Sequence, residues 1–205
     1  MYQQHTAYHL YNHSNNHELV FRSPEDYLYF LRKVRRELLP VADILCYCLM
    51  PDHFHFLIVP NASGCGPSPV FKSGGNRNRG DAADYQQLLS HRIKILLSSY
   101  TKATNRRYGR RGSLFRQHST AKAAFQLRPG RVITDEYPTY PAGSTYLTNC
   151  FFYIHNNPAK GDLVIAPEDW PYSSAADYAG NRDGTLCNYD LTRQLIGVER
   201  RKLAG

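Results

Sequence analysis

The stretch from Leu45 to Pro60, which reads LCYCLMPDHFHFLIVP, constrains the fold more than any other part of the chain. Two apolar runs flank a Pro-Asp pair, and because these residue types favour tight turns, the stretch predicts a β-hairpin. Side chains alternate along a strand, so His53 and His55 share one face. Phe54 and the following phenylalanine take the other face, where they can pack on a core.

The two histidines are spaced for joint binding of one ion. At two residues' rise their imidazoles are about 7 Å apart along the strand, close enough to converge on a metal. A His-x-His pair also occurs as a plain polar strand face or as hydrogen-bonded core histidines. The pair alone therefore predicts a metal site only if other motifs support it.

The segment before the hairpin predicts an α+β fold. Residues Ala7–Asn12 are typical of a strand, and Ser23 followed by Pro24 and two acidic residues is a typical helix start. That helix should run to about Leu39. A strand, a helix and then a hairpin predict an antiparallel sheet with helices packed on one face, in a single domain spanning residues 1–205.

A basic segment in the middle of the chain predicts contact with nucleic acid. A long mobile loop is expected at about 61–84 and a second helix at about 83–106, ending in the run NRRYGRRGSLFR. Arginines hold phosphates and aromatic rings stack on unpaired bases. The chain also has 25 Lys and Arg against 17 Asp and Glu, together with 16 tyrosines. The candidate DNA-binding residues are Arg106, Arg107, Arg110, Arg111 and Arg116.

The third informative helix is expected at about 144–157, after a possible strand at about 126–133. An apolar stripe of this helix forms its core face, whereas Tyr153 and Asn157, four residues apart, share a different face. Because Pro158 disfavours helical geometry in the preceding residue, the helix should end near Asn157.

The remaining features concern the chain's C-terminal part and its compartment. A C-terminal extension at about 162–205 should contain a last helix at about 191–203, with Trp170 packing the extension onto the core. Five cysteines without a CxxC pair predict reduced, structural thiols. No signal peptide and no apolar run of about 18 residues is apparent, so we expect a soluble intracellular protein without membrane contact.

Taken in order, these motifs resemble the single-tyrosine HUH transposases of insertion sequences and the related REP-associated tyrosine transposases. The resemblance rests on Tyr8 to Asn16, MPDHFH at 50–55, SYT at 99–101, GSLF at 112–115, YIHNNP at 153–158 and WPYSS at 170–174. It implies a ferredoxin-like sheet with the HUH motif on a central strand and a nucleophilic tyrosine on a C-terminal helix. It also implies a prokaryotic, cytoplasmic protein acting on nucleoid DNA.

By motif position, the resemblance implies that Tyr153 is the catalytic nucleophile and that His53, His55 and Asn157 bind a divalent metal. The implied activity is a metal-dependent single-stranded DNA endonuclease and strand transferase that forms a 5′-phosphotyrosine link and a free 3′-hydroxyl. Mg²⁺ or Mn²⁺ suits such mixed nitrogen and oxygen ligands. The implied partners are hairpin-containing single-stranded DNA and, in some relatives, a second copy of the chain.

Two other functions fit the same residues. One is a nucleic-acid-binding relative without cleavage activity, and the other is a small metallohydrolase that activates water at His53 and His55. His118 and His155 are further candidates for a ligand or an acid–base role. We expect both of these histidines to be structural, because a histidine beside an aromatic segment or a helix end usually is.

Overall fold

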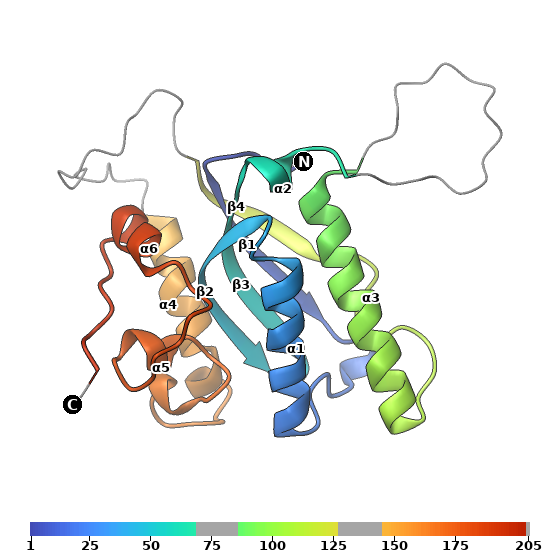
Figure 1. Ribbon diagram of the computed structural model, residues 1–205. Helices are drawn as coiled ribbons and strands as arrows, with labels where there is room; N and C mark the ends of the chain where they lie inside the picture. Colours follow the sequence, from blue (N-terminus) through green and yellow to red (C-terminus); the bar gives the residue numbers. More distant parts are fainter. Residues whose placement is uncertain (69–85, 127–144, 204–205) are drawn as a thin grey trace, which may run out of the picture.

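The computed structural model describes residues 1–68, 86–126 and 145–203 (Figure 1). Its strands and long helices are, in chain order, β1 (Thr6–His13), α1 (Pro24–Glu37), β2 (Ala42–Met50), β3 (His53–Pro60), α3 (Leu88–Tyr108), β4 (Thr120–Gln126) and α4 (Thr145–Lys160). Shorter elements are η1 (Asn15–His17), α2 (Ala62–Cys65), η2 (Pro167–Asp169), α5 (Ala175–Tyr178) and α6 (Tyr189–Ile196).

The four strands form one antiparallel sheet in the order β2-β3-β1-β4. With α1 between β1 and β2, and α3 between β3 and β4, this is the β-α-β-β-α-β arrangement of ferredoxin-like folds. The α+β class and the antiparallel sheet predicted from the sequence are confirmed. The strand that carries His53 and His55 is central, as predicted.

Helices cover both faces of this sheet (Figure 1). Phe54 of β3 lies 5.5 Å from Phe30 of α1 between ring centroids, so α1 covers the phenylalanine face. Its neighbour His55 points the opposite way and lies 5.7 Å from Tyr153 of α4. The sequence predicted that all helices pack on one face of the sheet. Helices α1 and α3 share one face, but α4 lies on the other. The apolar stripe of α4, which includes Leu147, needs burial too, and the free face of the sheet supplies it.

The turn of the hairpin is fixed by backbone bonds from earlier residues. The Pro51 carbonyl accepts from the amides of Val20 and Phe21, at 2.8 and 3.0 Å, and the Asp52 carbonyl accepts from Ser14 at 2.8 Å. A tight turn held on both carbonyls cannot slide in register, so the position of His53 directly after it is well defined.

Several element boundaries differ from the sequence predictions. The second helix begins at Leu88 and not near 83, because the Gln87 side chain bonds Tyr2 and the Cys65 carbonyl and holds the chain extended there. The fourth strand is Thr120–Gln126, earlier than the predicted 126–133, because Thr120 to Gln126 pair with β1. Residues 127–133 lie outside the described part of the chain.

Other differences concern helix ends. Helix α4 continues to Lys160, since Pro158 removes only one donor and the following turn is closed by a bond from the Gly161 amide to the Asn157 carbonyl, 2.9 Å. The last helix stops at Ile196, because Gly197 adopts a left-handed conformation with φ of 76°. Residues 62–65 of the predicted loop form α2, and residues 69–84 lie outside the described residues.

The C-terminal segment packs on the outer strand β2. The Trp170 indole donates to the Leu49 carbonyl at 2.9 Å, so this tryptophan holds the extension on the core, as predicted. The five cysteines are free, and four of them are buried. Within the described ranges, no helix is both long enough and apolar enough to cross a membrane.

Candidate active site on the histidine face

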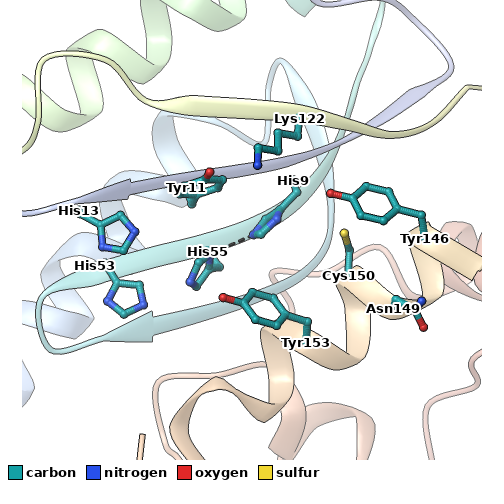
Figure 2. Close-up of a pocket in the computed structure, with 10 residues that line it drawn as sticks. All are labelled: His9, Tyr11, His13, His53, His55, Lys122, Tyr146, Asn149, Cys150 and Tyr153. Carbon is teal, nitrogen blue, oxygen red and sulfur yellow. Dashed lines mark hydrogen bonds between the residues drawn. The ribbon is translucent and has the colours of Figure 1, made fainter. Parts of the chain in front are cut away.

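Strands β1 and β3 together present four histidines on the face that α4 covers. His9 and His13 alternate with Tyr11 on β1, and the strand register places Tyr11 opposite His55 and His13 opposite His53. These side chains line a pocket of about 560 Å³ between the sheet and α4 (Figure 2). The pocket is completed by Lys122 of β4 and by Tyr146, Asn149, Cys150 and Tyr153 of α4.

The two histidines of the β3 motif are anchored in the same way. Nδ1 of His53 lies 2.5 Å from the Asp52 carboxylate, and Nδ1 of His55 lies 2.9 Å from Nε2 of His9. In each ring Nε2 is then the nitrogen left for a ligand. Nε2 of His55 is buried and has no hydrogen-bond partner among the described residues. Fixing one ring nitrogen by a hydrogen bond is how proteins orient a metal-binding imidazole.

Burial favours the neutral form of His9, His13 and His55. Desolvation lowers the pKa of His55 to about 2, with the neighbouring histidines adding to the effect. Burial, assisted by Lys122, lowers the pKa of His9 to about 4. The pKa of His13 is lowered by burial and by the adjacent His53 and Arg116. A neutral imidazole keeps a nitrogen lone pair, which is the form that binds metal ions.

A second group of possible ligands overlaps the first. His13, Asp52 and His53 bring one ligand atom each to within 4.8 Å of one another. The rings of His13 and His53 are stacked, with centroids 4.6 Å apart. The face thus offers more nitrogen ligands than the His-x-His motif alone.

Tyr153 lies over this cluster. Its ring centroid is 5.7 Å from that of His55 and 6.0 Å from that of His9, and its hydroxyl points from α4 toward the histidines (Figure 2). The Tyr153 side chain is 43% exposed and its hydroxyl makes no hydrogen bond to the described residues. The ammonium of Lys160 lies 5.4 Å from the ring centroid. The structure therefore brings Tyr153, His53 and His55 together, although they come from distant parts of the sequence.

Asn157 occupies a different position from these three. Its side-chain amide donates to the Tyr153 carbonyl at 2.9 Å, along its own helix. It is not among the residues that line the pocket. The role of a metal ligand for Asn157 stays a prediction, and it requires rotation of this side chain.

The five candidate arginines divide into two groups. The Arg107 guanidinium donates to the buried carboxylate of Asp26 at 3.0 Å. The Arg110 guanidinium donates two hydrogen bonds to the Glu18 carboxylate, at 2.8 and 3.0 Å. These two guanidinium groups hold the end of α3 to the domain. Arg106, Arg111 and Arg116 are exposed and form no ion pair with the described residues. The exposed three remain the candidates for phosphate contact.

The two further histidine candidates lie outside this pocket. His118 is exposed and lines a separate groove beside α3. Nε2 of His155 lies 2.7 Å from the Ser174 hydroxyl, in a buried contact between α4 and the C-terminal segment. The buried contact of His155 agrees with the structural role expected for it, and the structural role of His118 stays a prediction.

Sequence reasoning missed His9, His13 and Lys122. The signal in β1 was visible as HLYNH at 9–13, which places two histidines on one strand face at a period of two. Their partnership with β3 depends on strand pairing, which the local sequence does not give. Lys122 was missed because the strand that carries it was expected later in the chain.

Comparison with known proteins finds solved structures of similar fold. No protein-family model and no curated protein matches the chain. A solved REP-associated tyrosine transposase bound to a REP hairpin is similar to it, with a TM-score of 0.55 over 100% of this chain and 96% of that chain. The two sequences are 14% identical. A likeness at this identity establishes a shared fold, and the function has to be argued from the site.

Proposed function

We propose that the protein is a metal-dependent single-stranded DNA endonuclease and strand transferase that uses Tyr153 as its nucleophile. The observation that carries the proposal is the position of Tyr153 over His55, whose buried Nε2 lacks a hydrogen-bond partner among the residues that the structure describes. A buried polar atom without a partner is costly, and a ligand that binds it removes the cost.

The residues fit a divalent metal. His53 and His55 each have Nδ1 engaged and Nε2 left over, and the His55 imidazole is neutral. Mn²⁺ or Mg²⁺ bound there would act as a Lewis acid on a phosphoryl oxygen. Asn157 is the third ligand that the sequence resemblance implies, and that assignment is part of the proposal.

The chain's own residues supply the nucleophile and the positive charge. In the proposed reaction the Tyr153 oxygen forms a bond to phosphorus and the bond from phosphorus to the 3′-oxygen breaks. The phenol gives its proton to solvent, and the leaving 3′-oxygen takes one up to become a free hydroxyl. Lys160 beside the ring and Lys122 in the pocket place two ammonium groups near the phosphate. The phosphotyrosine link conserves the energy of the broken bond, so a second DNA end can be joined.

The proposed substrate is single-stranded DNA that contains a hairpin. The structural relative was solved with a DNA hairpin, and this chain is basic, with exposed Arg106, Arg111 and Arg116 near the end of α3 and after it. Phosphate contacts from such arginines position a strand without reading its sequence. A homodimer is a further expectation from the resemblance.

Two rival functions predict different behaviour. A protein that only binds DNA retains a binding curve but forms no covalent adduct. A metallohydrolase that activates water at His53 and His55 keeps its turnover when Tyr153 loses its hydroxyl. The exposed hydroxyl of Tyr153 over the cluster favours the nuclease over both.

The deciding experiment is a denaturing-gel assay for a covalent protein–DNA adduct, with a pool of hairpin oligonucleotides and Mn²⁺ or Mg²⁺. Tyr153→Phe and His53→Ala should each abolish the adduct. Tyr146→Phe is the matched control, because Tyr146 lies on the same helix and lines the same pocket, while Cys150 and burial raise its pKa. An adduct that survives Tyr153→Phe but not Tyr146→Phe refutes the assignment, and binding without any adduct supports the DNA-binding alternative.

A further inference from the structure

We propose that a groove beside α3 binds the double-stranded stem of the DNA hairpin, on the side of the sheet away from Tyr153. This surface, the α3 groove, is formed by one face of α3, by residues 112–119 and by Tyr2 and Gln86. The inference rests on the proposed function, since the stem is part of the substrate proposed there. It gives the protein a second DNA-binding surface, separate from the pocket that holds the histidines.

The α3 groove is positively charged. It has a volume of about 870 Å³, and its cationic side chains are Lys94, Lys102 and Arg116. These three are exposed, and none of them forms an ion pair with the described residues. Among the described residues, no aspartate or glutamate lines the groove. Three cations without a neighbouring acid favour an anionic ligand.

The two lysines are spaced along the groove. Lys94 and Lys102 lie eight residues apart on one helix, about 12 Å along its axis at 1.5 Å per residue. Ser98 and Thr101 line the groove between them. One strand of a DNA duplex carries a phosphate about every 3.4 Å along the duplex axis, so this length covers several phosphates. Lysine, serine and threonine side chains commonly donate to phosphate oxygens.

The rings of the groove favour a paired stem over an unpaired strand. Proteins hold unpaired strands by stacking exposed aromatic rings on the bases. Phe115 is only 3% exposed, and the Tyr2 ring packs edge-on against Tyr8 with centroids 5.0 Å apart. The active-site pocket instead presents Tyr146 and Tyr153, which are 46% and 43% exposed. Unpaired bases therefore suit the pocket, whereas the phosphate backbone of a stem suits the α3 groove.

The wall of the groove opposite α3 is fixed by hydrogen bonds within the protein. The Arg116 amide donates to the His13 carbonyl at 3.0 Å, and the Asn12 side chain donates to the Arg116 carbonyl at 3.2 Å. Asn105 of α3 donates to the Gly112 carbonyl at 2.9 Å, which ties this wall to the helix. Binding to a groove with fixed walls costs little conformational entropy.

The edge strand β4 connects the α3 groove with the active-site pocket. Ser119 lines the groove, and Lys122, three residues later, lines the pocket. The Phe115 ring of the groove lies 5.8 Å from Phe54, on the face of the sheet opposite the histidines. Strand β4 is the last strand of the sheet on this side. An unpaired strand that leaves the stem thus crosses β4 to reach Tyr153.

The test is the affinity for two fluorescent oligonucleotides, measured by anisotropy with EDTA present. One is a hairpin of arbitrary stem sequence, because phosphate contacts read no sequence, and the other is an unpaired strand of equal length. Lys94→Gln combined with Lys102→Gln should raise the Kd for the hairpin at least about tenfold, and for the unpaired strand less than about threefold. Lys202→Gln, which removes an exposed lysine from the C-terminal segment, is the matched control.

The salt dependence of binding gives a second readout. Each lost phosphate contact on a duplex reduces the slope of log K against log salt concentration by about 0.9, so the double variant should reduce it by about 2 for the hairpin. A purely structural role of the lysines would not change this slope. Glutamine keeps a high helix propensity, and thermal unfolding of each variant checks the fold.

The outcomes separate this inference from the proposed function. Hairpin binding that is absent, that is unchanged in the double variant, or that weakens no more than binding of the unpaired strand overturns the inference. If the original protein still forms the Tyr153 adduct in that case, the proposed function stands. If hairpin binding depends on the two lysines but no adduct forms, the α3 groove is retained and the nuclease activity is refuted.

Discussion

Two histidines of this protein are buried to similar extents but differ in what their nitrogens contact. His55 is 3% exposed and His155 is 6% exposed, and burial lowers the pKa of the first to about 2 and of the second to about 3. Nε2 of His155 lies 2.7 Å from the Ser174 hydroxyl, and its ring packs on Phe151 at 4.4 Å. Nε2 of His55 has no such partner in the part of the chain that the structure describes.

The comparison shows that burial and a shifted pKa do not by themselves mark a functional histidine. Desolvation is the largest cause of the low pKa of both rings. What separates them is the unpaired nitrogen of His55, together with a pocket and the Tyr153 hydroxyl beside it. The ring nitrogens of a structural histidine are hydrogen-bonded within the fold, whereas a ligand-binding histidine has one ring nitrogen without a partner in the protein.

The largest expected effect is on DNA cleavage, when the unpaired Nε2 of His55 is removed. His55→Leu should lower the single-turnover rate of DNA cleavage by about 10³-fold, because the metal loses a ligand at the reacting phosphate. The metal-free protein should keep its unfolding free energy within about 1 kcal/mol, since the change removes the bond to His9 and also a buried unpaired nitrogen. Urea denaturation with EDTA measures the second quantity. A large loss of stability would give His55 the structural role that His155 has.

The opposite pattern is expected for the other histidine. His155→Leu breaks the contact with Ser174 and the aromatic packing, so it should cost about 2 kcal/mol of unfolding free energy. The Kd for Mn²⁺ should stay within about threefold of the original. If His155→Leu abolishes metal binding without changing stability, the distinction between the two histidines is wrong.

A smaller effect follows from the pH dependence of stability. The folded-state pKa of His155 is about 3, below the value of about 6.5 in an unfolded chain. The unfolded state therefore takes up a proton first, so stability is present above pH 6.5 and is lost as pH falls toward 3. Between pH 6 and 5 this histidine should contribute a loss of about 1 kcal/mol. Urea denaturation of the metal-free protein at both values should show a smaller loss in His155→Leu, and equal losses contradict the assignment.

The sequence predicted the parts of the site that depend on local pattern. Alternation along β3 separated His53 and His55 from Phe54, and the helical spacing of α4 placed Tyr153 away from its apolar stripe. Each inference needed only the period of one element, and the structure bears out these placements.

The rest of the site depends on contacts between distant segments. The pairing of β1 with β3 brings His9 to His55 and His13 to His53, and this register is set by packing over the whole sheet. The Asn157 side chain could turn to the pocket or to its own helix, and its residue type does not decide between them. The ion pairs of Arg107 and Arg110 likewise separate them from three otherwise similar arginines only in the folded chain.

The most direct test of the account is to locate the covalent link by tandem mass spectrometry of the protein–DNA adduct after nuclease and trypsin digestion. We expect a 5′-linked nucleotide on Tyr153, formed only with the metal present and absent in His55→Leu. A nucleotide on Tyr146 or on any other residue, with Tyr153 unmodified, would contradict it.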